Sequence, residues 1–191
     1  MLNINNLFNN YFSLTVRLVL LKALLFFLIW KFVFIFFLRE TKLIDHPLTT
    51  HIGEYSTKLL NSFVDPPTFV VKREFIKSSE ISQIYNNNRK VVYVADGCNA
   101  LELMVGYIGF IFCLPSGFWR KVLYIVLGIL AIHSINIIRI AGLIYVNEFH
   151  QVHFDFTHLY LFKAIMYSFT FAIWMLYMRK IEVKRVSAQI R

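Results

Sequence analysis

Four long apolar segments, separated by shorter polar stretches, dominate the hydrophobic pattern of the chain. They cover approximately residues 18–38, 98–114, 122–146 and 159–178. A helix needs about 20 mostly apolar residues to cross the hydrocarbon core of a bilayer. The first segment is too long for a signal-peptide core and no small-residue cleavage site follows it, so we expect it to remain as an anchor. The pattern predicts an all-α polytopic membrane protein with about four transmembrane helices.

The region between the first two apolar segments has a different pattern. Thr68–Phe75 and Lys90–Ala95 alternate and are rich in β-branched residues, which predicts two strands. Ser78–Tyr85 between them is expected to form one or two helical turns, and Asn86–Asn88 to form a turn. We therefore expect a small α+β insert between helices 1 and 2. The predicted organisation is an N-terminal segment with the first span (1–38), the insert (39–97), a three-helix membrane core (98–178) and a basic tail (179–191).

Composition supports the membrane interpretation and limits the alternatives. The 191 residues are 58% hydrophobic and carry a formal net charge of +9, whereas soluble domains are about 45–50% apolar. An ordinary soluble globule, a disordered chain and a disulfide scaffold are therefore excluded. We interpret the positive charge as cytoplasmic flanks of membrane helices and expect no nucleic-acid partner.

The distribution of basic residues predicts the orientation. Arg120 and Lys121 lie in loop 115–121, the tail after the last span is basic, and loop 147–158 contains no Lys or Arg. Short loops rich in Lys and Arg remain in the cytoplasm. We therefore expect a multi-pass protein of the cytoplasmic (inner) membrane with both termini inside and the insert outside.

Ionisable residues near the spans are the informative ones, because each is costly to place in lipid. Arg139 lies 18 residues after Lys121, which is about 27 Å along a helix and close to the outer edge of the core. Cys98 is expected to open the second helix, and His158 the fourth, also from outside. Three distant segments thus deliver a thiol, a guanidinium and an imidazole to one depth at the outer face.

These three groups suit acyl transfer. A cysteine attacks as the thiolate, which is favoured at a helix N-terminus and beside cations. Arg139 can hold a developing oxyanion or a substrate carboxylate, and His158 can protonate a leaving amine. Each group also has a structural interpretation: Cys98 could pack, Arg139 could extend to the interface, and His158 could cap a helix or contact lipid headgroups. Cys113 is interpreted as a packing residue, too far from Cys98 for a disulfide.

Further polar residues are expected to support this site. His133, Asn136 and Arg139 form a slanting polar stripe on one helix, where Asn136 is predicted to bond neighbouring helices and orient Arg139. Glu102 lies one turn after Cys98 and could pair with Arg139 or His133. Asn99 directly follows the thiol.

Two other sets of polar residues have different expected roles. Lys22 and Lys31 in the first span are expected to extend to the interface or face the bundle. The cluster of His150, His153, Asp155 and His158 lacks a strong zinc spacing, so we expect neither a metal nor a cofactor.

Three elements in residues 95–178 resemble the exosortase/archaeosortase family of membrane cysteine transpeptidases. They are Asp96-Gly97-Cys98-Asn99-Ala100-Leu101, Asn136-Ile137-Ile138-Arg139-Ile140 and Thr157-His158, in the order of the family's Cys, Asn-x-x-Arg and His elements. Typical members have more spans, so the chain resembles a short branch such as the exosortase F type. The shorter interval from Arg to His leaves His153 and His150 as alternatives to His158.

The resemblance implies catalytic roles for Cys98, Arg139 and His158. It also implies that the substrates are exported proteins ending in a short motif, a membrane span and basic residues. Cleavage would form a thioester on Cys98 before transfer to an acceptor or hydrolysis, with membrane lipids as the only other expected partners. Two alternatives remain: a non-enzymatic membrane scaffold or assembly factor, and a transporter subunit with Arg139 in a polar path.

Overall fold

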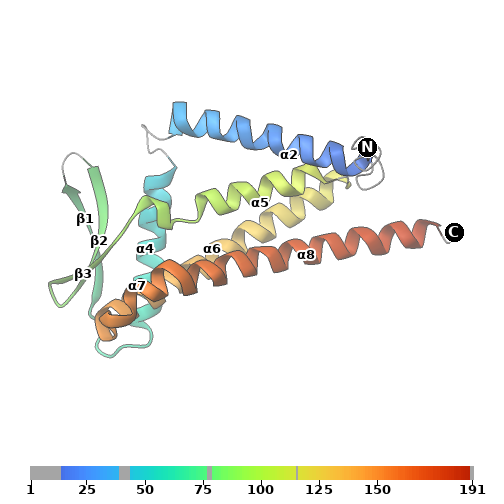
Figure 1. Ribbon diagram of the computed structural model, residues 1–191. Helices are drawn as coiled ribbons and strands as arrows, with labels where there is room; N and C mark the ends of the chain where they lie inside the picture. Colours follow the sequence, from blue (N-terminus) through green and yellow to red (C-terminus); the bar gives the residue numbers. More distant parts are fainter. Residues whose placement is uncertain (1–13, 39–43, 77–78, 115, 190–191) are drawn as a thin grey trace, which may run out of the picture.

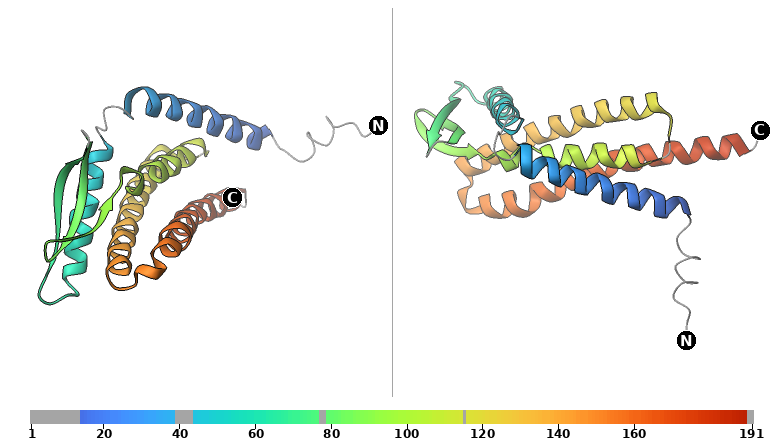
Figure 2. Two further views of the ribbon diagram at one scale, coloured as in Figure 1. Left: turned by 60° about the vertical axis from the view of Figure 1, so that its left-hand side comes forward. Right: turned by 90° about the horizontal axis from the view of Figure 1, so that it is seen from above.

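The computed structural model describes residues 14–38, 44–76, 79–114 and 116–189. Four helices, α2, α5, α6 and α8, run alongside one another, and a small sheet with helix α4 lies at one end of them (Figure 1). Two further views show the same arrangement and show that α4 runs crosswise to the long helices (Figure 2). The beginning of α2 and the end of α8 lie at the opposite end from the sheet. We call these two ends of the molecule the sheet end and the far end.

Three described helices are long and apolar enough to cross a membrane: Arg17–Phe36, Phe118–Phe149 and Gln151–Arg179. The first comprises α2 (Leu14–Val33) and the π-helical turn η1 (Phe34–Leu38), and the second is α6 (Phe118–Phe149). The third contains η3 (Gln151–His153), α7 (Phe154–Phe156), η4 (Thr157–Leu161) and the first part of α8 (Phe162–Gln189). The prediction of a helical polytopic membrane protein is confirmed, whereas three of the four predicted spans are found as long apolar helices among the described residues.

The second apolar segment forms a helix, but its predicted start is wrong. Helix α5 covers Leu101–Cys113, and its 13 residues span only about 20 Å at 1.5 Å per residue. The preceding residues Asp96–Cys98 form a separate 3-10 turn, η2. Ala100 has a left-handed backbone with φ of 60°, which interrupts any continuous helix from Cys98. Alone, α5 is shorter than the roughly 30 Å hydrocarbon core.

The sheet end contains one helix and three strands. Helix α4 (Asp45–Asn61) packs against an antiparallel sheet of β1 (Phe69–Ile76), β2 (Ser79–Asn86) and β3 (Arg89–Val94), in the order β1-β2-β3. We call α4 and these strands the sheet subdomain. Both predicted strands and the predicted Asn turn are confirmed; Asn87 and Asn88 have positive φ, as a tight hairpin turn requires.

The helical prediction for Ser78–Tyr85 is wrong, because most of that stretch belongs to β2. Ile81, Ile84 and Tyr85 have the three-to-four spacing of a helix face, which explains the error. As the central strand, β2 pairs with β1 on one side and β3 on the other. These two ladders outweigh the local pattern.

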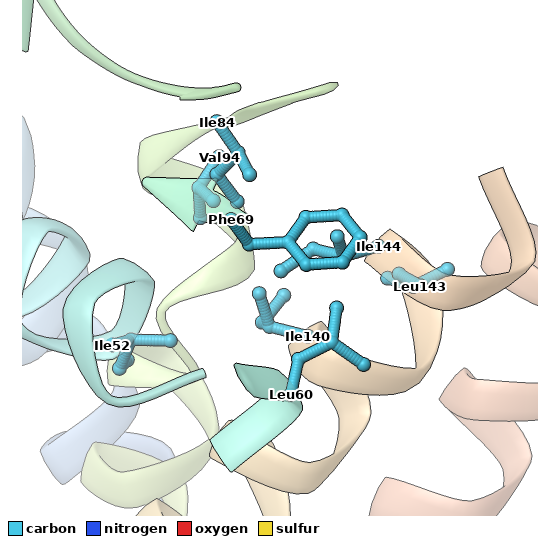
Figure 3. Close-up of a cluster of buried hydrophobic side chains, with 8 residues drawn as sticks. All are labelled: Ile52, Leu60, Phe69, Ile84, Val94, Ile140, Leu143 and Ile144. Carbon is cyan, nitrogen blue, oxygen red and sulfur yellow. The ribbon is translucent and has the colours of Figure 1, made fainter. Parts of the chain in front are cut away.

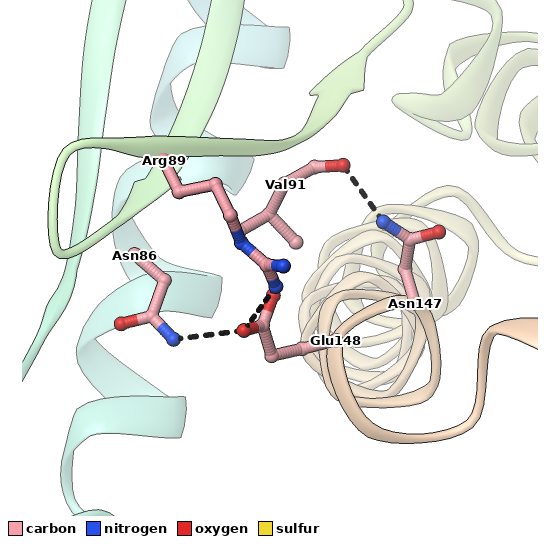
Figure 4. Close-up of polar contacts among 5 residues, drawn as sticks. All are labelled: Asn86, Arg89, Val91, Asn147 and Glu148. Carbon is pink, nitrogen blue, oxygen red and sulfur yellow. Dashed lines mark hydrogen bonds and ion pairs between the residues drawn. The ribbon is translucent and has the colours of Figure 1, made fainter.

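The core of the sheet subdomain continues onto the last part of α6 (Figure 3). Its buried members come from α4, all three strands and α6: Ile52, Leu60, Phe69, Ile84, Val94, Ile140, Leu143 and Ile144. Polar contacts add to this packing. Ser56 Oγ donates to the Ile137 carbonyl at 3.0 Å, and Asn147 Nδ2 donates to the Val91 carbonyl at 2.7 Å (Figure 4).

Glu148 of α6 fixes the hairpin between β2 and β3. It accepts hydrogen bonds from Arg89 at 2.6 Å and from Asn86 at 3.2 Å (Figure 4). Together with the bond from Asn147 to Val91, these contacts hold the beginning of β3 against the end of α6.

The far end is built from apolar and aromatic side chains. Tyr107, Ile111, Ile132 and Tyr177 belong to one buried cluster formed by α5, α6 and α8. The large apolar side chains exposed along α2 and α6 are typical of surface that faces lipid.

Candidate active site

Cys98 lies in the short connection between β3 and α5, and the chain is fixed on both sides of it. The Cys98 N–H donates to the Ala95 carbonyl at 2.8 Å. The next side chain, Asn99, is 2% exposed, donates to Asp45 Oδ1 at 2.8 Å and accepts from the Leu101 N–H at 2.9 Å. Asn99 thus anchors the turn to the start of α4 and also bonds the first residue of α5.

The expected position of Cys98 at the head of its helix is wrong. Asn99 and Ala100 separate the thiol from α5, and Ala100 adopts the left-handed conformation. For a residue with a Cβ atom this conformation costs about 1–2 kcal/mol and persists where surrounding contacts impose it. Here the hydrogen bonds of Asn99 hold Ala100 in this conformation. Cys98 therefore lies in a turn, partly exposed, and not within a helix.

His158 is the titratable side chain that meets the thiol. Its Nε2 lies 4.0 Å from Cys98 Sγ, which is within the range of a thiol–imidazole contact, and such contacts tighten when a substrate binds. His158 belongs to the π-helical turn η4, a feature often found at functional sites. Phe154 stacks on the imidazole with ring centroids 5.6 Å apart and planes 16° apart, which holds the ring in position.

Asn136 connects the backbone of the nucleophile turn to Arg139. Its side chain is fully buried; Nδ2 donates to the Cys98 carbonyl at 3.0 Å, and Oδ1 accepts from Arg139 Nη1 at 3.3 Å. Arg139 is 9% exposed, and its buried Nε makes no hydrogen bond to the described residues. The guanidinium is therefore held by Asn136 through Nη1, and its Nε remains a donor without a partner among the described residues.

Two cavities open beside this turn. Cys98 and His158 line one of about 140 Å³, together with residues of β3 and the end of α6. Arg139 instead lines a second cavity of about 230 Å³, which also contains Asp45, Glu102 and Lys163. The structure thus brings Cys98 to His158 directly and to Arg139 through Asn136.

The remaining predicted residues lie around this centre. Glu102 is exposed in the first turn of α5 and makes no salt bridge with Arg139 or His133 among the described residues, so neither predicted pairing is formed. The ring of His133 lies against that of His51 of α4, with centroids 5.2 Å apart and the planes tilted by 35°. His133 therefore meets the sheet subdomain. Asn136 contacts Arg139 as predicted, whereas its other bond goes to the backbone of the turn at Cys98 and not to a neighbouring helix.

The other candidates lie away from the Cys98–His158 contact. His150 and His153 are exposed in the connection before α7. Within the described ranges, no group of three or more His, Cys, Asp or Glu side chains is arranged to hold a metal ion. Cys113 is buried at the far end of α5, and both cysteines are free thiols. Lys22 is exposed on α2, whereas Lys31 lies over the rings of Phe27 and Phe34.

Sequence analysis missed the part that α4 plays in holding the site. Asp45 and Thr49, which contact the Asn99 side chain, are both on α4. A signal was present, because Asp45 followed by Pro47 is a typical helix start. The stacking of Phe154 on His158 had no comparable signal, since it depends on the π-helical turn.

Comparisons with known proteins identify the family. No curated protein and no solved structure matches the chain. Residues 12–180 match the transmembrane exosortase family (Exosortase_EpsH). The match includes α2 and the sheet subdomain as well as the segment that carries the Cys, Arg and His elements. The chain therefore belongs to the transmembrane exosortase family.

Proposed function

We propose that this protein is a membrane-embedded cysteine transpeptidase or protease that removes C-terminal sorting tails from exported proteins. The observation that carries the proposal is the 4.0 Å contact between Cys98 Sγ and His158 Nε2. It joins residues 60 positions apart in a chain whose family is one of membrane transpeptidases. The site uses protein side chains alone and calls for no cofactor.

The first half-reaction makes a thioester. The Cys98 proton passes to His158 Nε2, and the thiolate attacks the scissile carbonyl carbon. The tetrahedral intermediate then breaks the carbon–nitrogen bond, and the departing amine takes the proton from His158. The acyl group of the substrate remains on Cys98, and the tail leaves with a new amino terminus.

The second half-reaction restores the enzyme. His158 accepts a proton from the incoming nucleophile, which attacks the thioester carbonyl. The carbon–sulfur bond breaks, and the proton returns to the Cys98 sulfur. An amine acceptor gives transpeptidation, and water gives hydrolysis.

Arg139 supplies positive charge next to the reacting group. A guanidinium remains protonated and can donate several hydrogen bonds in one plane. Because Asn136 occupies only Nη1 of Arg139, the other donors are available to a developing oxyanion or to the substrate backbone. Asn136 is then a positioning residue, since it bonds both the Cys98 carbonyl and Arg139.

The depth of the site suits a substrate that is itself anchored in the membrane. Helix α6 has 32 residues and is about 48 Å long, which exceeds the roughly 30 Å hydrocarbon core. With Lys121 at the cytoplasmic surface, Arg139 lies near the outer one, and the sheet subdomain lies outside the cytoplasmic membrane. A substrate held by its C-terminal span would present the preceding motif at the level of Cys98.

The sheet offers a way to bind that motif. Strand β3 is at an edge of the sheet and is followed within four residues by Cys98. An extended peptide can add to such an edge through backbone hydrogen bonds. A motif bound along β3 would run toward the thiol.

A scaffold function is the second candidate, and one observation favours it. Polar side chains of α6 are used in contacts between elements: Asn136 with the Cys98 carbonyl, and His133 with His51. A scaffold needs these contacts but does not need a reactive thiol.

Replacing Cys98 by Ala in the native host separates the two functions. We expect exported proteins that end in a motif, a span and basic residues to keep their tails in that strain. Cys113→Ala is the matched control and should leave maturation unchanged. Normal maturation with Cys98→Ala protein present in the membrane at wild-type level would contradict the enzymatic function and leave the scaffold.

A further inference from the structure

We propose that the cavity beside Cys98 is a specificity pocket for an aliphatic side chain of about the size of leucine. The side chain belongs to the substrate residue whose carbonyl forms the thioester. The inference rests on the proposed function and adds the residue type at the cleavage position. We call this space the Cys98 pocket.

The Cys98 pocket lies between β3 and α6. Val94 of β3 and Ile140, Leu143 and Ile144 of α6 form its apolar walls. These four side chains are at most 5% exposed and belong to the core of the sheet subdomain. The walls are therefore fixed by the fold rather than assembled on binding.

The volume of the pocket sets the size of its occupant. It measures about 140 Å³, close to the roughly 150 Å³ apolar cavity that accommodates a benzene molecule. A branched aliphatic side chain fits this space, glycine leaves most of it empty, and an indole ring exceeds it.

The lining determines the polarity of the occupant. Cys98 and His158 are the polar groups of the reaction itself, and Tyr93 is the other lining side chain with a polar atom. Tyr93 is 60% exposed. A carboxylate placed among the valine, leucine and isoleucine walls would lose its water without gaining partners there. The pocket therefore favours an apolar side chain and rejects a charged one.

The position of the sulfur assigns the occupant to the acyl side of the scissile bond. Cys98 Sγ is part of the wall, 4.0 Å from His158 Nε2. In a thioester, the Cα of the acyl residue is two bonds from the sulfur. Its side chain must therefore lie next to the sulfur, and the Cys98 pocket is the adjoining apolar space.

Alkylation by amino-acid chloromethyl ketones tests the inference without a known substrate. In this reaction the Cys98 thiolate displaces chloride from the methylene carbon, a thioether forms, and the thiol proton goes to His158 or to buffer. The probes are the N-acetyl chloromethyl ketones of leucine, glycine, aspartate and phenylalanine, applied to the full chain in lipid vesicles. The rate at Cys98 is measured by mass spectrometry and divided by the rate with iodoacetamide.

We expect the leucine probe to react at least about 10-fold faster than the glycine and aspartate probes, the scale on which apolar pockets discriminate. Leu143→Ala should enlarge the pocket and raise the phenylalanine-to-leucine rate ratio by about fivefold or more. Leu60→Ala is the matched control, because Leu60 lies in the same core but not in the wall of the pocket. It should leave the ratio unchanged.

The outcomes separate this inference from the proposed function. If Cys98 reacts with iodoacetamide but the leucine, glycine and aspartate probes agree within twofold, the specificity pocket is wrong and the proposed function stands. Equal changes of the rate ratio in the Leu143 and Leu60 variants would also overturn the pocket. If Cys98 reacts no faster than Cys113 even with iodoacetamide, both the proposed function and the pocket are wrong.

Discussion

The two cysteines of this chain lie at opposite ends of one segment and have different surroundings. Cys98 is partly exposed at the sheet end and contacts His158, and its backbone carbonyl is bonded by Asn136. Cys113 is 6% exposed at the far end, followed by the buried Leu114. The residues that give the two cysteines different surroundings do not lie in the segment between them. The polar groups around Cys98 come from α6 and η4, elements distant in sequence.

The two ends are also held together by different interactions. At the sheet end, single hydrogen bonds fix the position of the thiol, among them those of Asn99 and Asn136. At the far end, aromatic side chains interlock: Phe110 meets Trp174 with ring centroids 3.8 Å apart, and the Tyr107 hydroxyl donates to the Tyr124 carbonyl at 2.9 Å. Changes at one end should therefore leave the chemistry of the other end intact.

Removing the imidazole should give the largest effect. We expect His158→Ala to lower cleavage of tailed proteins by about 100-fold or more, the usual contribution of a general acid–base. His153→Ala is the control, because His153 is an exposed histidine five residues earlier, in η3. Tail cleavage in membrane preparations measures both. A larger loss in His153→Ala than in His158→Ala would transfer the proton-transfer role to His153.

Removing Asn136, which bonds both the Cys98 carbonyl and Arg139, should have a smaller effect on the reaction rate. Asn136→Ala loses the bonds to the Cys98 carbonyl and to Arg139, and a misplaced nucleophile should lower the alkylation rate of Cys98 by about 10-fold. Ser134→Ala, an exposed position on the same helix, should leave the rate unchanged. Iodoacetamide kinetics measure this difference, and equal rates in the wild type and Asn136→Ala would remove Asn136 from the site.

A larger side chain in the packed far end should lower the stability of the protein and leave the reactivity of Cys98 unchanged. A Cβ atom at Gly128 would overlap the ring of Tyr107, whereas nothing lies within 4 Å of one at Gly106. We expect Gly128→Ala to cost about 1–3 kcal/mol and Gly106→Ala to be neutral or slightly stabilising. Thermal unfolding in detergent measures both variants. The comparison between the two ends fails if folded Gly128→Ala protein shows slower Cys98 alkylation.

The smallest expected effect concerns the exposed face of the sheet. Hydrogen bonds from Lys90 and Tyr85 hold the pKa of the Glu74 carboxyl below its usual value. A depressed pKa means that the stabilisation is present above the ordinary glutamate pKa and is lost as the pH falls through the lower, folded-state value. Glu74→Gln should therefore unfold at a slightly lower temperature than the wild type at pH 6, and the difference should vanish in acid. If the difference in unfolding temperature between the wild type and Glu74→Gln grew in acid, the pKa of Glu74 would not be lowered in the folded state.

The amount that the sequence could predict differs between the elements. The long helices and two of the strands follow from apolar runs and alternation, because lipid and a sheet face impose those periods directly. Strand β2 could not be predicted, since its pairing on both sides outweighs its helix-like spacing. The start of α5 was missed because the contacts of Asn99 with α4 place a turn where the apolar pattern continues.

The candidate site, like the fold, could be predicted from the sequence only in part. That Cys98, Arg139 and His158 come close together could be inferred from the chain, whereas the contacts that connect them could not. Which histidine meets the thiol depends on the π-helical turn η4 and on Phe154. Arg139 is linked through Asn136 to the backbone carbonyl of Cys98, and not directly to the thiol. Such links depend on side chains brought together by packing, and periodicity does not encode them.

The most direct test is to label the two thiols from outside. A membrane-impermeant maleimide applied to sealed, right-side-out vesicles carrying the full chain distinguishes both reactivity and sidedness. The account predicts that Cys98 is labelled at least about 10-fold faster than Cys113, because Cys98 is partly exposed beside the imidazole of His158 and Cys113 is buried. Equal labelling of the two cysteines, or labelling of Cys98 only after the vesicles are opened, would contradict it.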